Sequence, residues 1–288
     1  MRYPKASVVM ALFVLAMTVA RGAEGWKPLF NGKDLSGWDT WLAKPHPSVD
    51  VPGEAKNEKG EYTQVLGAKD PLNVFTIVAV DGQPAVRISG QIFGGITTKE
   101  NFSNYHLRLQ FKWGEKKWAP REAVVRDSGL LYHVHSGWAP VRDIWPRSPE
   151  LQIQEHDCGD LYAIASQITV RAKRLDPAKR QFQYDPKGEP TVFIQQPPIG
   201  NKCIKGEDRE KPNGEWNTIE LVCLGDQSIH IVNGGVVMRL TDARRIDGPE
   251  PKMLTSGQIV LQSEGAEIFY RNIELRPITA IPAEFAEK

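Results

Sequence analysis

Two β-strands are predicted within the stretch DSGLLYHVHSGWAPVRDIWPRSPELQIQEHD, which runs from Asp127 to Asp157. Successive side chains of a strand point to opposite faces, and both halves of this stretch alternate in that way. In the first strand, one face carries Leu130, Tyr132 and Val134 and the other carries Asp127, Gly129 and His133. In the second strand, Leu151 and Ile153 lie opposite Glu150, Gln152, Gln154 and His156. Each strand is therefore expected to have an apolar back and a polar front.

The polar front of the second strand predicts the floor of a cleft. Titratable and amide side chains in a row are costly to bury without partners. The loop between the two strands adds Trp138 and Trp145, which could roof the cleft and stack on a sugar, or could only pin the loop. Imidazole, carboxylate and amide groups beneath tryptophans indicate a sugar site. The alternative is a hydrated sandwich face that happens to carry amides.

The first residues predict export. An uncharged apolar run from Val8 to Ala20 follows Arg2 and Lys5, and it ends in small residues. This pattern is typical of a signal peptide and is short for a membrane span. We expect a signal peptide over residues 1–23, no membrane insertion, and a periplasmic or extracellular protein whose single domain covers residues 24–288.

The mature chain predicts strand after strand. The range 105–113 alternates over nine residues, the range 164–174 alternates again, and Asn233-Gly234 marks a hairpin turn. Only the range 175–214, rich in Lys, Asp, Pro and Gly, interrupts this pattern, which predicts a long insertion that is either a lid or disordered. Many short strands with regular turns favour an all-β jelly roll or β-sandwich.

Charge and cysteine content bear on nucleic-acid binding, disulfide bonds and zinc binding. Lys and Arg number 36 against 35 Asp and Glu, so nothing in the charge balance attracts nucleic acid. Cys223 alternates with apolar residues and is expected to be a buried thiol. Cys158 and Cys203 are predicted in loops, where they either form a disulfide bridge with each other or stay free. Their spacing does not resemble a zinc site. The sequence carries no signal for oligomeric state.

Several motifs occur together in one order along the chain. They are LFNGKDLSGW at 29–38, DSGL at 127–130, ELQI at 150–153, GDLY at 159–162, Trp216-Asn217, Asn233-Gly234, LQSEG at 261–265 and YRNI at 270–273. This set resembles the 3-keto-disaccharide hydrolase family, also described as a 3-keto-glucoside lyase/hydratase domain. The resemblance implies a concanavalin A-like jelly-roll β-sandwich, an exported protein and action on 3-keto sugars. Two features depart from the family: His133 stands where many members carry Arg, and the insertion at 175–214 is long.

The implied chemistry depends on the ketone. A ketone at C3 of a glycosyl ring acidifies the proton on C2, so a base can remove it and the enolate can expel the C1 substituent. Addition of water then gives net hydrolysis. Such a site needs a base at the C2 proton, a stabiliser of charge at the C3 oxygen and an acid at the leaving oxygen.

The polar strands supply candidates for these roles. We expect His133, Glu150 and His156 to be catalytic, with either His133 or His156 as the base because imidazole titrates near neutrality. The other candidate histidine, most simply His156, would join Glu150 in holding a divalent metal ion; no organic cofactor is expected. Lys112 or Arg271 could replace the metal. The expected substrate-binding residues are Lys112, Asp127, Gln152, Gln154, Trp138, Gln262, Glu264 and Arg271.

Other readings stay open. Arg271 could pair with a sheet carboxylate, and Glu264 could cap a loop instead of reaching the cleft. A non-catalytic carbohydrate-binding module would need the same cleft without a base. A retaining glycosidase would need two carboxylates about 5 Å apart, and the second strand offers only Glu150 as a facing acid.

Overall fold

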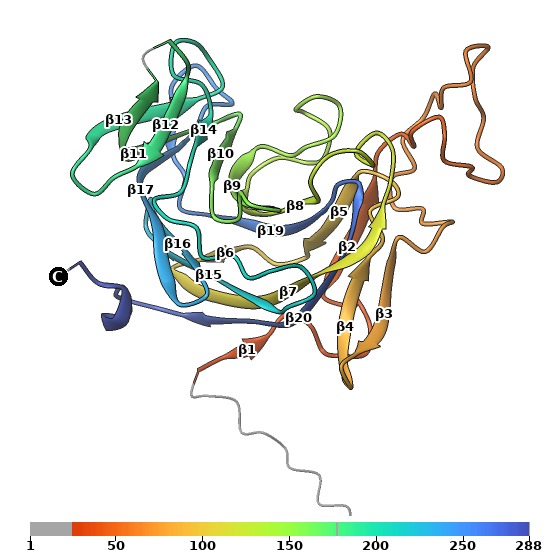
Figure 1. Cartoon of the computed structure of the whole chain (residues 1–288), viewed down its shortest axis with the longest axis horizontal. Helices are drawn as coiled ribbons and strands as arrows, with labels where there is room; N and C mark the ends of the chain where they lie inside the picture. The colour runs from red at the N-terminus through yellow and green to blue at the C-terminus, as the bar shows by residue number, and fades with distance from the viewer. Residues whose placement is uncertain (1–24, 177, 288) are drawn as a thin grey trace, which may run out of the picture.

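The computed structural model describes residues 25–176 and 178–287, so the predicted signal peptide lies outside the described residues. Within them the chain forms two antiparallel sheets that pack face to face (Figure 1). This arrangement confirms the predicted all-β jelly-roll sandwich. The one helix in the described residues is a short 3-10 turn, η1 (Ala283–Phe285). No helix described here has the length and apolarity needed to cross a bilayer.

The larger sheet has twelve strands, and its central strands lie below the smaller sheet in Figure 1. Its order is β12 (Gln181–Tyr184), β11 (Ser166–Asp176), β17 (Gly235–Arg245), β16 (Gln227–Val232), β15 (Asn217–Leu224), β7 (Tyr105–Lys117), β20 (Ala266–Pro277), β4 (Gln83–Ile88) and β3 (Phe75–Val80). Three strands pair outside this path: β1 (Lys27–Pro28) with β20, β13 (Glu189–Ile194) with β11, and β18 (Lys252–Met253) with β17.

The smaller sheet has eight strands and carries the stretch 127–157. Its order is β14 (Lys202–Cys203), β10 (Leu161–Ile164), β9 (Ser148–Gln154), β8 (Asp127–Val134), β19 (Ser256–Ser263), β5 (Gly94–Thr98) and β2 (Trp38–Leu42), with β6 (Phe102–Ser103) beside β19. The strands β8 and β9 are neighbours and antiparallel, as predicted, and β19 flanks β8 on the other side.

The main core lies between the two sheets. Alternate residues of β7 point into it, including Leu107 and Leu109, and they meet Leu130 of β8 and Leu151 of β9 in one apolar cluster. Full burial of such a side chain stabilises the fold by about 1.5–3 kcal/mol. The predicted apolar backs are therefore confirmed for Leu130, Tyr132, Leu151 and Ile153. The prediction is wrong for Val134, which packs with Leu131 and Val260 in a separate cluster because the strand bulges before it. The polar fronts of these strands point to the opposite face of the eight-stranded sheet.

A bulge interrupts the alternation of β8 near its end. The register with β19 shifts between Leu131 and Val134, and His133 takes a positive φ of 48°. A bulge inserts a residue and re-aims the side chains around it. The ring of His133 consequently lies against Tyr105 and Tyr132, in the core between the sheets. The prediction that His133 shares a face with Asp127 and Gly129 is wrong for this reason.

The range 175–214 is more regular than predicted. It contains the end of β11 and the strands β12, β13 and β14, and Phe182 and Phe193 pack in a second apolar cluster beneath them. This cluster also contains residues of β10, β11 and β17, so the described part of the range packs as an ordered part of the fold, which contradicts the disordered alternative. The bridge between Cys158 and Cys203 is absent, since both are free and buried, as is Cys223.

Candidate active site

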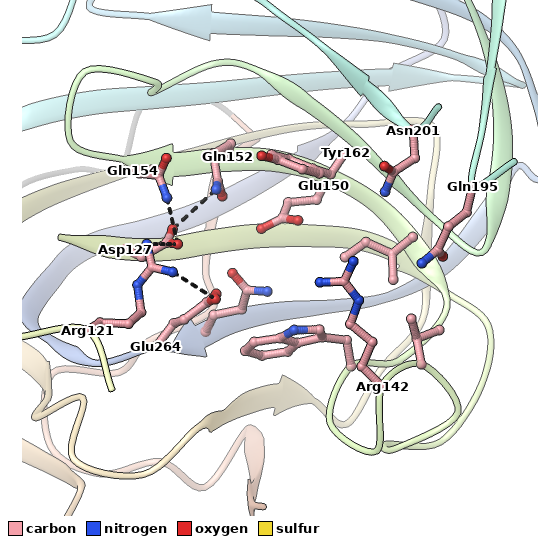
Figure 2. Close-up of a pocket in the computed structure, with 14 residues that line it drawn as sticks. Arg121, Asp127, Arg142, Glu150, Gln152, Gln154, Tyr162, Gln195, Asn201 and Glu264 are labelled. Carbon is pink, nitrogen blue, oxygen red and sulfur yellow. Dashed lines mark hydrogen bonds and ion pairs between the residues drawn. The ribbon is translucent and has the colours of Figure 1, made fainter. Parts of the chain in front are cut away.

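A cavity of about 230 Å³ opens on the polar face of the eight-stranded sheet. Its floor is formed by β8, β9 and β19, and loops from both sides of the sheet complete its walls (Figure 2). The lining residues are Arg121, Asp127, Val141, Arg142, Trp145, Glu150, Gln152, Gln154, Tyr162, Ile164, Gln195, Asn201, Gln262 and Glu264. The cavity therefore combines three carboxyl groups, two guanidinium groups and several amides with a tyrosine and a tryptophan.

Strand register gathers the floor residues. Asp127 of β8 lies opposite Gln154 of β9, and Gly129 lies opposite Gln152. Residues that face each other across an antiparallel pair bring their side chains close on the same side of the sheet. Glu150 and Gln152 belong to one parity of β9, so both point away from the core and into the cavity.

Gly129 leaves room for the two polar groups above it. A Cβ atom built on Gly129 would lie 2.1 Å from Oε1 of Glu150 and 2.1 Å from Oε1 of Gln262. No side chain larger than hydrogen fits there without moving those groups. The glycine of the first predicted strand thus determines where the carboxyl group of Glu150 and the amide of Gln262 lie.

Asp127 is held by three donors at one end of the cavity (Figure 2). Nη2 of Arg121 lies 2.6 Å from its Oδ2. The side-chain amides of Gln154 and Gln152 donate to Oδ2 at 2.7 Å and to Oδ1 at 3.2 Å. Nη1 of Arg121 also lies 3.9 Å from Oε1 of Glu264. Arg121 therefore sits between two carboxyl groups, and Asp127 is fixed in one orientation.

The three carboxyl groups hold their protons unusually tightly. Burial raises the pKa of Asp127 to about 7, although Arg121 and the hydrogen bond from Gln154 oppose this rise. Burial, followed by repulsion from Asp127, raises the pKa of Glu150 well above its usual range. Burial and repulsion from both neighbours do the same for the pKa of Glu264, against the attraction of Arg121 and Arg142. Carboxyl groups in such a site can exchange protons near neutral pH.

The other end of the cavity is lined by amides, one cation and apolar surface. Arg142 comes from the loop between β8 and β9, and Gln195 and Asn201 come from the segment between β13 and β14. Tyr162 and Ile164 of β10 complete this wall. Figure 2 shows Arg142, Gln195 and Asn201 on the side of Glu150 that faces away from Asp127.

Six of the residues predicted from sequence line this one cavity. They are Asp127, Glu150, Gln152, Gln154, Gln262 and Glu264. Trp145, predicted as part of a roof, lines it too. What each of these residues does in catalysis or binding stays a prediction. Five other candidates, His133, His156, Lys112, Trp138 and Arg271, lie elsewhere.

The two histidines are separated from the cavity for different reasons. His133 is turned into the core by the bulge in β8, and burial lowers its pKa to about 4, so it stays neutral. His156 follows the last residue of β9, where the chain turns, and its φ is 75°. It is exposed in a separate hollow beside Glu155 and Glu210. Strand parity cannot be extended past the residue where a strand ends.

The remaining candidates make other contacts. Lys112 pairs with Asp81 at 3.3 Å. Arg271 stacks on Trp216, with its guanidinium carbon 3.8 Å from the ring centroid, and donates to Gln110. Lys112 and Arg271 therefore belong to the twelve-stranded sheet and not to the cavity.

Trp138 holds the loop between β8 and β9 in place. Its ring stacks on Trp41 at a centroid distance of 4.9 Å, and its Nε1 donates to Oγ1 of Thr97 at 3.1 Å. This is the loop-pinning alternative considered for it from the sequence.

The metal site predicted for Glu150 and His156 is not formed by that pair. Glu150 lines the cavity, whereas His156 lines the separate hollow. In the part of the chain that the structure describes, no group of three or more His, Cys, Asp or Glu side chains is arranged to hold a metal ion. Glu150 and His156 therefore do not share a divalent cation.

Sequence reasoning missed Arg121, Arg142, Tyr162, Gln195 and Asn201. Four of them lie in connections between strands, which carry no alternation from which a direction could be predicted. Tyr162 did have a signal, because it belongs to the GDLY motif at 159–162 and alternates with the buried residues Leu161 and Ala163.

Comparisons with known proteins identify the family of this chain. No curated protein matches the chain significantly. A solved structure from Parabacteroides distasonis, named as a proposed glycosyl hydrolase, is 19% identical with a TM-score of 0.48, over 88% of this chain and 94% of that chain. A β-glucanase of Bacillus licheniformis is 10% identical with a TM-score of 0.40, over 88% of this chain and 97% of that chain. The family model described as the 3-keto-alpha-glucoside-1,2-lyase-like domain matches residues 25–276, and the chain belongs to this family.

Proposed function

We propose that the protein cleaves 3-keto glycosides by removing the C2 proton, eliminating the C1 substituent and adding water. The observation that carries this proposal is the set of three carboxyl groups, Asp127, Glu150 and Glu264, in one cavity of a chain that belongs to a 3-keto-glucoside lyase-like family. Burial raises the pKa of all three groups, so a protonated carboxyl group and a charged one can lie side by side, as a paired acid and base requires.

Glu264 is the group best placed to act as base. Its Oε1 lies 3.9 Å from Nη1 of Arg121, and its side chain is 16% exposed. Burial and repulsion from Asp127 and Glu150 raise its pKa, which makes its carboxylate a stronger base once it is ionised, and Arg121 and Arg142 favour that ionised form. Asp127 is occupied by donors from Arg121, Gln152 and Gln154. Glu264 has positive charge nearby but does not accept these hydrogen bonds, so its carboxylate can take the proton from C2.

Glu150 is the group best placed to act as acid. It is 5% exposed and makes no ion pair within the described residues. Burial and the nearby carboxyl of Asp127 favour its protonated form. A protonated Glu150 can donate to the leaving oxygen, which would then point toward the end of the cavity formed by Arg142 and Asn201 (Figure 2).

Asp127 and Arg121 act through position and charge. Arg121 supplies the fixed positive charge at the end where the C3 oxygen becomes an enolate oxygen, in place of Lys112 or Arg271. Asp127 holds that guanidinium in its orientation. The amide oxygens of Gln152 and Gln262 are buried without a partner in the described structure, so both are available to ring hydroxyls.

The reaction balances with these groups alone. The C2–H bond breaks and its proton passes to Glu264, while the C1–O bond breaks and the leaving oxygen takes a proton from Glu150. A 1,2-unsaturated 3-keto sugar and the free leaving group result. Water then adds at C1 and gives its proton to Glu150, and Glu264 returns a proton to C2.

One observation favours a second candidate function, retaining hydrolysis of ordinary glycosides. The sequence offered only Glu150 as a facing acid, but the structure adds Asp127 and Glu264 to the same cavity. Two carboxyl groups are the requirement for such an enzyme. Because this mechanism needs no ketone, the two functions differ in the substrate that they accept.

Substitution of the two glutamates tests the proposal. We expect Glu264→Gln and Glu150→Gln each to reduce cleavage of 3-ketotrehalose by at least about 10²-fold, the lower range for loss of a general acid or base. Trehalose itself should remain uncleaved by the wild type. Gln91→Glu, outside this cavity, serves as a folding and handling control. Full activity of either glutamine variant removes that residue from the mechanism, and cleavage of trehalose supports the second candidate.

A further inference from the structure

We infer that the end of the cavity formed by Arg142, Gln195 and Asn201 binds an acidic leaving group, with the guanidinium of Arg142 receiving a sugar carboxylate. The identification of this ligand as the leaving group rests on the proposed function, which places the scissile bond beside Glu150. The binding of the acid itself can be measured without any cleavage.

Arg142 occupies a strained position at the tip of a tight turn. The backbone N–H of Ile144 donates to the carbonyl of Val141 at 3.1 Å, and the two central residues have φ values of 52° at Arg142 and 58° at Asp143. Two positive φ values are the pattern of a type I′ turn, which strongly favours Gly, Asn and Asp. Strained residues that persist are concentrated at functional sites. Here the strain coincides with a guanidinium that lines the cavity.

The surrounding loop holds this turn firmly. Val141 and Trp145 exchange backbone hydrogen bonds of 3.1 and 2.9 Å. Trp138 stacks on Trp41, and Trp145 lies against Phe93 with a centroid distance of 6.2 Å. The tip that carries Arg142 is therefore anchored on both sides. Such anchoring reduces the ordering cost when a ligand binds.

Arg142 has no carboxylate within ion-pair distance among the described residues, and it acts on the carboxyl group of Glu264 only from farther away. Arg121, the other guanidinium of the cavity, has carboxylate oxygens at 2.6 and 3.9 Å. Arg142 forms no ion pair with any residue in the ranges 25–176 and 178–287. Figure 2 shows its guanidinium directed into the cavity. This end of the cavity accordingly carries a positive charge that a ligand can pair with.

Two amides are fixed beside that cation. The side-chain oxygen of Gln195 accepts from the backbone N–H of Ala165 at 3.3 Å, which leaves its NH₂ group for another partner. The backbone of Asn201 is tied to β10 because its carbonyl accepts from Ala163 at 2.8 Å. The turn between these residues is closed by the hydrogen bond from Ile194 to Gly200 at 3.0 Å. Both amides are therefore presented by a braced segment.

This combination fits a carboxylate better than a neutral sugar alone. A guanidinium offers two parallel donors in the geometry of a carboxylate, and such charge-assisted bonds are about twice as strong as neutral ones. The amide donors of Gln195 and Asn201 and the apolar surface of Ile164 suit the hydroxyl groups and ring of the same residue. A uronic acid or another sugar acid meets all three requirements.

Binding of simple sugars tests the inference. We expect D-glucuronate to bind the wild type about tenfold or more tightly than D-glucose by titration calorimetry, since a hydrogen bond to a charged group contributes enough for that ratio. Arg142→Gln should remove the preference, Arg142→Lys should restore part of it, and the exposed Arg180→Gln should leave it unchanged. Added salt should weaken glucuronate binding more than glucose binding.

The outcomes separate this inference from the proposed function. Glu150→Gln should lose cleavage of 3-ketotrehalose and still prefer glucuronate, because its change lies outside the acid-binding end. Equal affinity of the wild type for both sugars, or a preference that survives in Arg142→Gln, overturns the inference. Neither of those results depends on whether a 3-keto glycoside is cleaved.

Discussion

Replacement of Gly129 by Ala tests whether the floor of the cavity positions the catalytic groups. Gly129 lies in the middle of β8 and its φ is not positive, so the backbone accepts alanine without strain. The new methyl group would nevertheless lie 2.1 Å from Oε1 of both Glu150 and Gln262. The perturbation is therefore local to the cavity, and the strand pairing is expected to remain.

The size of the effect follows from the contact distances. An ordinary contact of a Cβ atom begins at 3.4 Å, so each oxygen must move by about 1.3 Å. A misplacement of about 1 Å can reduce the rate of an enzyme by 10²-fold. We expect Gly129→Ala to lower kcat/KM by at least about 10²-fold. The free energy of unfolding in urea should fall by about 1–3 kcal/mol, the usual range for overpacking.

The assay compares kcat/KM for 3-ketotrehalose with the midpoint of urea unfolding in the same preparations. Gly248→Ala is the matched control, because nothing lies within 4 Å of a Cβ at that position and its φ is not positive. A Gly129→Ala protein that folds and retains full activity would refute the assignment of Glu150 to the catalytic site.

Three further predictions concern stability and redox state. Arg121→Met should lower the free energy of unfolding in urea by about 3 kcal/mol, because it leaves the buried Asp127 without its cation. The double variant Arg121→Met, Asp127→Asn should recover part of that loss. If the effects of the two substitutions simply add, the ion pair does not stabilise the fold. His133 has its pKa lowered by burial to about 4, so below about pH 6.5 the unfolded chain binds a proton that the folded chain does not. From pH 6.5 down to pH 4 the wild type should therefore lose about 1.4 kcal/mol more per pH unit than His133→Asn; parallel pH profiles would contradict the buried neutral ring. A thiol reagent should detect the three cysteines only after denaturation without reductant, whereas a count of one would indicate a bridge.

Much of the cavity floor could be predicted because it depends on strand periodicity. The parity of β9 placed Glu150 and Gln152 on one face, and the register with β8 brought Asp127 beside them. Gln262 lies in β19, which flanks β8, and Glu264 directly follows that strand; both belong to the LQSEG motif at 261–265. Period and motif together were sufficient for the part of the cavity that consists of regular strands.

The walls could not be predicted because they depend on irregular backbone. His133 leaves its expected face through a bulge of one residue, for which the local sequence gives no turn signal. Arg121, Arg142 and Gln195 reach the cavity from three separate connections, and their directions are set by long-range contacts such as the stack of Trp138 on Trp41. Alternation predicts which side of a strand a residue faces, but it predicts nothing about side-chain direction beyond the end of the strand.

Isotope exchange during turnover tests the removal of the C2 proton most directly. The wild type is incubated with 3-ketotrehalose in D₂O, and the released 3-keto sugar is examined at C2 by NMR at early times. The same sugar incubated without enzyme corrects for spontaneous exchange. We predict that the product carries deuterium at C2 and that trehalose is not cleaved. Cleavage that retains the original hydrogen at C2, and that is not slowed when this hydrogen of 3-ketotrehalose is replaced by deuterium, would contradict the mechanism.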